Sequence, residues 1–398
     1  MKKEDLLNSK SFCVLPFIHA CIFQNGNAQP CCINETKLGD VKKYSIEEIY
    51  SSKNKTLINF RKDFLTDKLP ESCFKCKEVE DYRAHSYRQR SNARYHHLLD
   101  QIDINSDESL VSNEKIFLWD IRFSNLCNLK CVICDSSDSS RIEDHNGNTR
   151  LISAFDNTDE FISYFEKQID NVEEIYFAGG ESLLMEDHYK ILDLFIKHKK
   201  FDVKLRYNTN ATVSSLKDKE ITEYWKHFNH VRISVSLDAG WEQFEYIRFG
   251  SKWEIALENL RRFRSEVPHV YVHIGIVVTI LNIFYIRRLH EFLVNENIIP
   301  SDGMYFLIVY GKDHLRPETL PNRLKKKAYA YYKKWLEETG DQNLIDQIKL
   351  IINILGSQEK AIFKNNIILK NKMAQFDKSR NTNFFETFKE LEGIFDGI

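Results

Sequence analysis

The sequence predicts an α/β fold in which six strand and helix units form a partial parallel (β/α)6 barrel. Two observations lead to this fold class. Strand-like and amphipathic helical runs alternate from residue 116 onward, and polar motifs follow the predicted strands. Successive units of this kind build a parallel sheet whose functional loops lie at the strand C-terminal ends. The strands are expected at 116–123, 174–177, 203–207, 231–236, 270–279 and 304–310, and the helices at 159–169, 185–198, 219–228, 253–263, 284–295 and 323–338.

The composition is that of an ordinary soluble globular protein. The chain has 398 residues, 42% hydrophobic and 29% charged, with a formal net charge of −2, which gives no basis for bulk nucleic-acid binding. Residues 1–10 are polar, so neither a signal peptide nor a membrane span is expected, and a cytoplasmic location is predicted. In a reducing compartment the nine cysteines are expected to be metal ligands or thiols rather than disulfides.

Three cysteines lie close together just after the first predicted barrel strand. Cys127, Cys131 and Cys134 have three and then two residues between them. Three such thiolates can hold three irons of a four-iron cluster, which leaves the fourth iron without a protein ligand. No cysteine or histidine follows in the next few residues, and His145 is the nearest downstream candidate. The alternatives are buried free cysteines or a zinc site completed from elsewhere.

A second group of cysteines precedes this loop. A turn at 24–27 separates the apolar runs 14–22 and 28–32, which predicts a hairpin that brings Cys13 and Cys31 together. Cys73 and Cys76 follow a helical stretch at 46–64 and complete a set of four ligands. Four thiolates can hold either zinc or an iron–sulfur cluster.

Polar residues occupy alternate positions on several predicted strands and the turns after them. They predict a wide, polar barrel interior that holds a polar ligand, the alternative being that some face outward onto helices or pair as internal ion pairs. The set is Asp120, Arg122, Arg206, Asn208, Asn210, Arg232, Ser234, Ser236, Asp238, His273, Gly275 and Thr279. After the second barrel strand, Gly179 and Gly180 permit close backbone approach to a ligand, and Glu181 can accept from an ammonium group.

The loop from Cys127 to Cys134 resembles the signature of the radical S-adenosylmethionine (radical SAM) enzymes, with Ile133 where the family usually has an aromatic residue. The resemblance implies that S-adenosylmethionine binds the open iron of a [4Fe–4S] cluster, that its cleavage gives a 5′-deoxyadenosyl radical, and that this radical abstracts hydrogen from a substrate. It also implies roles for residues at the strand ends. Gly179, Gly180 and Glu181 would bind the amino group of the cofactor, Ser236 and Asp238 would lie near its ribose or methionine part, and Arg248 would meet its carboxylate. Asn208 would be a further cofactor contact, and Val277 and Thr279 would neighbour adenine.

The N-terminal cysteine segment resembles the SPASM/twitch domain, on Cys13 to Phe17, Gly26 to Cys32, Gly39, Arg61 and Cys73 to Cys76. That resemblance implies an auxiliary iron–sulfur cluster, expected as [4Fe–4S], on Cys13, Cys31, Cys73 and Cys76. Such a domain usually follows the barrel, whereas here it precedes it. Cys31 is favoured over Cys32 as the ligand, and Cys21 is expected to pack in the hairpin.

Four regions are predicted: a SPASM/twitch-like domain at 1–80, a basic helix and linker at 81–114, the partial barrel at 115–312 and a helical cap at 313–398. The basic segment contains Arg83, Arg88, Arg90 and Arg94 with Tyr82, Tyr87 and Tyr95, and is interpreted as a solvated connecting helix.

The predicted function is hydrogen abstraction from a peptide, in cross-linking, epimerisation or oxidation, or from a small molecule such as an amino-sugar. The absence of an evident peptide-recognition domain weighs against the peptide. The expected partners are the substrate and a reductant such as flavodoxin or ferredoxin, with no membrane and no nucleic acid. The alternative from another class is a non-catalytic iron–sulfur or zinc sensor that binds nucleic acid through the arginine-rich segment.

Overall fold

A computed structural model of the chain describes residues 6, 9–102, 104–105, 110–111, 115–357 and 362–397. The predicted linker at 101–113 falls largely outside these residues. The chain divides into two compact units. The first comprises Met1–Asn128, Ser136–Thr209 and Ser214–Arg232, and the second comprises Leu129–Asp135, Asn210–Val213 and Ile233–Ile398.

The first unit is built on a sheet with the strand order β9-β8-β6-β1-β2-β3. Its first four strands in this order are parallel, as the alternating pattern predicts, and β2 and β3 add antiparallel strands at the edge. The strands are β1 (His19–Ile22), β2 (Asn27–Gln29), β3 (Gly39–Asp40), β6 (Leu118–Ile121), β8 (Glu174–Phe177) and β9 (Lys204–Thr209).

The predicted N-terminal hairpin is present, and it belongs to this sheet. β1 pairs antiparallel with β2 across the predicted turn, where Gly26 has a φ of +86°. The apolar run before the turn is only partly a strand, because it begins as the short helix α2 (Leu15–Ile18). β1 also pairs in parallel with β6, from His19 beside Leu118 to Ile22 beside Ile121. The cysteine hairpin therefore extends the sheet directly from the first predicted barrel strand.

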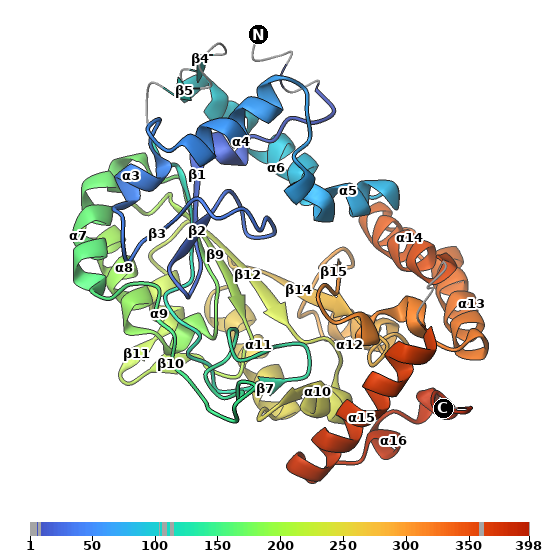
Figure 1. Cartoon of the computed structure of the whole chain (residues 1–398). Helices are drawn as coiled ribbons and strands as arrows, with labels where there is room; N and C mark the ends of the chain where they lie inside the picture. Colours follow the sequence, from blue (N-terminus) through green and yellow to red (C-terminus); the bar gives the residue numbers. More distant parts are fainter. Residues whose placement is uncertain are drawn as a thin grey trace. The chain divides into compact units, whose positions relative to one another are not determined.

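One face of this sheet is apolar and is covered by helices α7 (Thr158–Gln168) and α8 (Glu186–Lys197) (Figure 1). Trp119 of β6 packs edge-on against Phe165, with ring centroids 5.1 Å apart. Both helices have acidic residues in the first turn. These negative charges stabilise the helices because the N-terminal end of a helix dipole is positive. Burial of these aromatic side chains contributes to the hydrophobic stabilisation of the unit.

The opposite face is polar, as the alternation predicts for β6 and β9. The parallel registers place Cys21, Asp120, Tyr176 and Arg206 in one row across β1, β6, β8 and β9. Because side chains alternate between faces along a strand, these four point to the same side of the sheet.

Four helices complete the N-terminal part of the first unit: α3 (Ile46–Tyr50), α4 (Lys55–Leu65), α5 (Phe74–Asp81) and α6 (Tyr87–Tyr95). Helix α6 differs from the predicted solvated connecting helix. Arg88 is buried and pairs with Glu80 at 2.9 Å, and Arg94 pairs with the buried Glu174 at 2.6 Å. These arginines hold the helix to its own unit, so the basic composition of the segment does not make it a solvated face.

In the second unit, strand β14 (Tyr271–Val278) lies between β12 (His230–Ser236) and β15 (Met304–Ile308). Strands β14 and β15 are parallel. The helices are α10 (Trp241–Ile247), α11 (Trp253–Glu266), α12 (Ile286–Asn295), α13 (Asn322–Glu338), α14 (Gln342–Gly356), α15 (Ile362–Arg380) and α16 (Phe384–Thr387). Helices α13 and α14 lie side by side (Figure 1). The mostly parallel sheet with surrounding helices and the helical C-terminal region confirm the predicted fold class. In the part of the chain that is described, no helix is both long and apolar enough to cross a membrane.

A buried histidine makes the stability of the first unit depend on pH. His188 is 0% exposed, and its Nε2 lies 3.0 Å from the hydroxyl of Tyr207. Burial, followed by the charge of Lys219, lowers the pKa of His188 to about 3 from 6.5. The unfolded chain binds this proton more readily than the folded chain does. The neutral, buried His188 therefore makes its full contribution to the free energy of unfolding above pH 6.5, and this contribution is lost as the pH falls toward 3.

We expect His188→Gln, which can keep a hydrogen bond to Tyr207, to remove this pH dependence. Between pH 7 and pH 5 the wild type should lose about 2 kcal/mol more of its free energy of unfolding than the variant does. Urea unfolding of both proteins at the two pH values measures the difference. Equal losses would show that His188 is not held neutral in the folded protein.

Candidate cofactor and cluster sites

All four predicted auxiliary ligands line one cavity in the first unit. Cys13, Cys31, Cys73 and Cys76 are all in the wall of this cavity. Cys13 immediately precedes the N-terminal end of α2, Cys31 follows the hairpin strand β2, and the other two lie at the start of α5. Residues far apart in the sequence are therefore brought together by the hairpin and by two helix ends.

Burial raises the pKa values of Cys13, Cys31 and Cys76, and the backbone N–H groups of Leu15, Ile33 and Arg88, respectively, lower them in part. The side-chain nitrogen of Asn34 lies 3.5 Å from the Cys73 sulfur. Hydrogen bonds to sulfur are one of the ways a protein tunes an iron–sulfur cluster.

Burial makes ionisation of these four thiols unfavourable unless a cationic group binds among them. Burial is the main cause that raises the pKa of all four thiols, and it raises the pKa of Cys73 to about 12. Neighbouring cysteines add to the shift, since Cys76 and Cys73 both raise the pKa of Cys13. Thiolates crowded in this way need a positive group among them, and cluster binding displaces their protons.

The other two N-terminal cysteines lie outside this cavity wall. Cys21 is fully buried in β1, and Cys32 faces a different set of groups, which includes Asp120, Arg122 and the hydroxyl of Tyr87. Among the described residues, no group of three Cys, His, Asp or Glu side chains is arranged so that it could hold a single metal ion.

In the second unit, Cys131 and Cys134 lie on a loop fixed by a two-stranded sheet. Strand β7 (Lys130–Cys131) pairs antiparallel with β13 (Arg248–Phe249), which sets Cys131 opposite Arg248. The N–H of Val132 donates to the carbonyl of Ile247 at 2.7 Å and continues this pairing. Arg248 Nη1 lies 3.9 Å from the sulfur of Cys131.

The surroundings of Cys131 favour its thiolate. A hydrogen bond from Cys134 is the main cause that lowers the pKa of Cys131, and the charges of Arg248 and Arg380 lower it further against the effect of burial. A low thiol pKa supports metal binding because the thiolate is the ligand. In the N-terminal cavity, by contrast, the surroundings raise the pKa values of the four thiols.

Arg248 is also paired with Asp238. Its Nη2 lies 2.7 Å from Asp238 Oδ2, and Oδ1 of the same carboxylate accepts from the N–H of Val277 at 2.9 Å. Asp238 has a φ of +62°, a strained value for a residue other than glycine, at the end of β12. The buried Nε of Arg248 has no hydrogen-bond partner, so the guanidinium retains a donor for an anionic group.

Two further cations hold the same loop from outside the cysteine motif. Arg380 at the end of α15 donates to the carbonyl of Lys130 at 2.9 Å and stacks over Phe376 at 3.9 Å. Lys312 donates to the carbonyl of Cys134 at 2.7 Å. These contacts fix the backbone on both sides of Cys131 and place positive charge beside the cysteines.

Cys127 belongs to the first unit, where its N–H donates to Ser140 Oγ at 3.3 Å. The glycines after β8 lie against the backbone that precedes it. A Cβ on Gly180 would lie 2.1 Å from the carbonyl oxygen of Leu126, and a Cβ on Gly179, where φ is +82°, would lie 2.8 Å from Cβ of Arg122. The two glycines therefore allow the end of β8 to pack closely against the backbone before Cys127. Packing within the chain itself thus requires glycine at both positions.

Glu181 is fully buried in the first unit. Its Oε1 accepts from Thr209 Oγ1 at 2.9 Å and from the N–H of Leu183 at 3.2 Å. Asn208 lies half-buried near the end of β9, on the polar face. In the second unit Ser236 is half-buried at the end of β12, Val277 is half-buried on β14, and Thr279 is buried just after β14.

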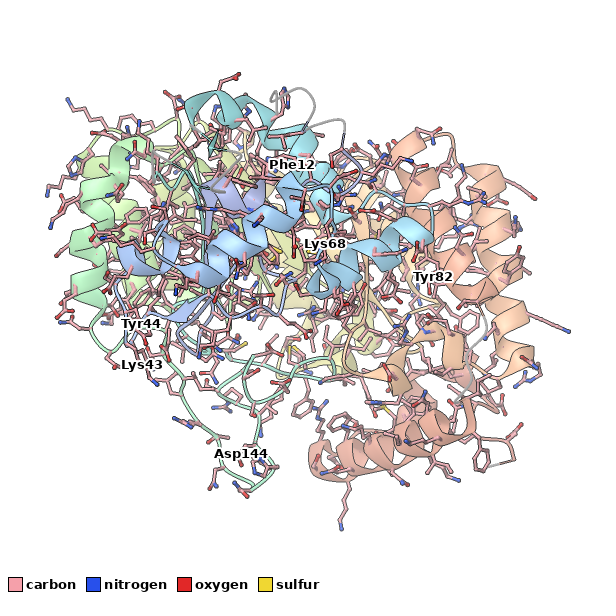
Figure 2. The ribbon with its side chains drawn as sticks, turned by 45° about the horizontal axis from the view of Figure 1, so that its top comes forward. Phe12, Lys43, Tyr44, Lys68, Tyr82 and Asp144 are labelled. Carbon is pink, nitrogen blue, oxygen red and sulfur yellow. The ribbon has the colours of Figure 1, made fainter. Side chains whose placement is uncertain are left out.

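His145, the nearest downstream histidine, is exposed in a turn of the first unit. Figure 2 shows the preceding residue, Asp144, at the tip of a projecting loop. Asp144 Oδ1 accepts from the N–H of Asn146 at 2.8 Å and stabilises this turn.

Comparison with protein families explains this combination of cysteine sites. The family model described as the radical SAM superfamily matches residues 121–293, and the SPASM model, described as an iron–sulfur cluster-binding domain, matches residues 13–77. Residues 121–293 of this chain therefore form a radical SAM domain, and residues 13–77 form a SPASM domain that precedes it in the sequence. A radical SAM domain carries a [4Fe–4S] cluster and S-adenosylmethionine, and the SPASM domain carries an auxiliary iron–sulfur cluster.

The solved structures that match this chain share little sequence identity with it. Native anSMEcpe with bound AdoMet has a TM-score of 0.40 and 19% identity, and the match covers 56% of this chain and 62% of that one. SuiB of Streptococcus suis bound to S-adenosylmethionine has a TM-score of 0.39 and 16% identity, with 71% and 50% covered. This chain therefore spans less than two thirds of the length of either protein. No curated protein matches the chain.

The cation at the end of α15 gives a prediction for the radical SAM cluster. A positive charge stabilises the more negative, reduced form of a cluster, so Arg380→Met should lower its midpoint potential by on the order of tens of millivolts. Arg380→Lys keeps the charge and should shift the potential less. The measurement is a redox titration followed by the electron paramagnetic resonance (EPR) signal that changes when S-adenosylmethionine is added. An unchanged potential in Arg380→Met would contradict an electrostatic role for this arginine.

Proposed function

We propose that Cys127, Cys131 and Cys134 hold the [4Fe–4S] cluster at which S-adenosylmethionine is reductively cleaved, and that the enzyme abstracts hydrogen from a carbon of a polar substrate. When bound, the cluster and its cofactor supply a 5′-deoxyadenosyl radical. The protein contributes alignment of the substrate carbon with that radical and exclusion of competing reactions.

The observation that carries this proposal is the position of Arg248. Its guanidinium lies 3.9 Å from the Cys131 sulfur, is held by Asp238 and has an unpartnered buried Nε. A fork of N–H donors beside a cluster cysteine is suited to the carboxylate of S-adenosylmethionine, since arginine pairs with carboxylates in two-point contacts.

The remaining cofactor contacts are proposed from the same motifs. Glu181 would accept from the cofactor amino group, with Gly179 and Gly180 holding the turn that presents it. Ser236, Asp238 and Asn208 would meet the ribose or methionine part. In the SPASM domain, Cys13, Cys31, Cys73 and Cys76 are the proposed ligands of an auxiliary [4Fe–4S] cluster, supported by their shared cavity and by the hydrogen bond from Asn34 to Cys73.

The proposed substrate is a peptide, which would be cross-linked, epimerised or oxidised, and the alternative is a small molecule such as an amino-sugar. Either fits a polar sheet face. One electron must reach the cluster in each reductive cleavage, so a reductant of the flavodoxin or ferredoxin class is the proposed partner.

The nucleic-acid sensor is less well supported than an enzyme. Its binding surface would be the arginines of segment 83–94, and two of them are already used within the chain. Arg88 pairs with Glu80, and Arg94 pairs with Glu174.

Cluster loading and cofactor cleavage test the proposed function together. Anaerobically reconstituted wild type should hold about eight irons per chain and release 5′-deoxyadenosine when it is reduced with S-adenosylmethionine. The variant Cys127→Ala/Cys131→Ala/Cys134→Ala should hold about four irons and release none. Iron and sulfide assays with chromatography of the nucleoside products measure both quantities.

Single substitutions in the N-terminal segment provide a matched control for this experiment. Cys31→Ala should lose the auxiliary cluster and hold about four irons, whereas Cys32→Ala should keep about eight. Retained cofactor cleavage in the triple variant would contradict the assignment of the open cluster. An unchanged iron content in Cys31→Ala would contradict the auxiliary ligand set.

A further inference from the structure

Helix α15 of the second unit presents a strongly basic surface to solvent. From Ile362 to Arg380 the helix has five cationic side chains and one carboxylate. Four of the cations are exposed lysines, which together are called the lysine surface of α15: Lys364, Lys370, Lys372 and Lys378. The whole chain has a formal net charge of −2, so this surface is a local concentration of positive charge.

The single carboxylate of the helix is already engaged within the protein. Asp377 is half-buried, and its Oδ1 accepts hydrogen bonds from Tyr246 Oη and Thr382 Oγ1, each at 2.9 Å. Its Oδ2 accepts from the N–H of Phe384 at 2.9 Å. Both oxygens therefore join α15 to the neighbouring elements of the unit, and the carboxylate is not positioned to neutralise the exposed lysines.

The lysine surface also differs from the exposed lysines of other helices, which have acidic partners. On α8, for example, Lys190 lies 2.8 Å from the carboxylate of Asp159. Within the described part of the chain, Lys364, Lys372 and Lys378 form no such ion pair. Like charges gathered on one helix repel one another and do not stabilise the fold. They are suited to an anionic partner, because opposite charges steer and orient the encounter of two proteins.

This surface adjoins the loop that holds two of the proposed cluster ligands. Arg380, the last residue of α15, donates to the carbonyl of Lys130 at 2.9 Å. Lys312 precedes the short helix η5 (Asp313–Leu315), which packs against α15, and it donates to the carbonyl of Cys134 at 2.7 Å. Cys134 is itself only half-buried. An electron that enters at α15 would therefore have a short path through the protein to the cysteine loop.

The surroundings of a buried histidine show that α15 and the segment before η5 share one cationic region. His314 lies in η5 and is buried. Burial, followed by the charges of Lys372 and Lys312, lowers the pKa of His314 to about 4. One of these lysines comes from α15 and the other contacts the cysteine loop, so the positive potential extends from the helix to that loop.

We propose that the lysine surface of α15 is the docking site of an acidic electron-carrier protein of the flavodoxin class, which reduces the radical SAM cluster. In each transfer the flavin hydroquinone anion of the carrier would lose one electron and become the neutral semiquinone, and the cluster would gain that electron. No covalent bond forms or breaks, and no proton moves. Nucleic acid is also anionic, but a carrier that must deliver electrons accounts for the position of the surface beside the cysteine loop. This inference rests on the proposed function, because it locates the reductant of the same enzyme.

Binding of a flavodoxin with an acidic isoelectric point tests this site on the full chain with reconstituted clusters. Isothermal titration calorimetry gives the dissociation constant at about 50 mM and about 500 mM NaCl. The test variant removes three exposed charges from α15: Lys364→Gln/Lys372→Gln/Lys378→Gln. The matched control removes three exposed charges from α13 in the same unit: Lys326→Gln/Lys333→Gln/Lys334→Gln.

We expect the wild type and the α13 control to bind flavodoxin with similar affinity at low salt, and the α15 variant to bind about tenfold more weakly. At high salt the three dissociation constants should agree within about twofold, because counterions screen exposed charges. Cleavage of S-adenosylmethionine driven by reduced flavodoxin should fall in the α15 variant alone. Cleavage driven by dithionite, which needs no docking site, should be equal in all three proteins.

Circular dichroism and iron content confirm that each variant is folded and loaded, and the single charge reversal Lys378→Glu carries the test if the triple variant is not. Equal affinities of the wild type and the α15 variant, equal losses in both triple variants, or no binding of flavodoxin to the wild type would overturn the inference. So would displacement of flavodoxin by an equal concentration of duplex DNA, which would assign the surface to nucleic acid. A loss of dithionite-driven cleavage in every protein would contradict the proposed function instead, so the two proposals can fail independently.

Discussion

The parallel pairing of β1 with β6 is the constraint on which both sites of the first unit depend. It joins the N-terminal cysteine hairpin to the strand that leads into the radical SAM cysteine loop, with Cys21 directly beside Asp120. The SPASM domain precedes the barrel strands in the sequence, and this pairing joins it to the sheet of the first unit. One side of the hairpin contributes Cys31 to the auxiliary cavity, while Cys32 faces the polar sheet face where Asp120 and Arg122 lie.

The two cysteine environments differ in the way that their proposed roles require. The four auxiliary thiols line one cavity, burial raises all four pKa values, and neighbouring cysteines raise those of Cys13, Cys31 and Cys73 further. Such a site is suited to a cluster enclosed by protein. Cys131 instead has a lowered pKa, with Arg248 and Arg380 among the causes, and the same Arg248 retains a free buried donor. A cluster there can share its surroundings with an anionic ligand.

The repeating strand and helix pattern predicted most of the fold because hydrophobic periodicity is a local property. The strand at 174–177 matches β8, and the helix at 323–338 differs from α13 by one residue. The pairing of β1 with β6 could not be predicted, because it joins segments about a hundred residues apart. The basic composition of the segment predicted that Arg88 and Arg94 are solvated. This prediction was wrong because tertiary contacts pair them with Glu80 and Glu174.

The cysteines and the glycine pair of the candidate sites were visible in the sequence, but their surroundings were not. Gly180 was expected to admit a ligand, whereas the carbonyl of Leu126 occupies the space a side chain would need. Arg380 and Lys312 had no motif to mark them, since each acts on a backbone carbonyl of the cysteine loop from far along the chain.

The most direct test of the central claim is electron–nuclear double resonance on the reduced, reconstituted wild type with S-adenosylmethionine labelled with ¹⁵N at the amino group and ¹³C at the carboxylate. If the cluster on Cys127, Cys131 and Cys134 has an open iron that binds the cofactor, both labels should show hyperfine coupling to the cluster, and the carboxylate coupling should weaken or disappear in Arg248→Met. A reduced cluster that shows no coupling to either label would contradict the account, because the cofactor would then not be bound at the iron.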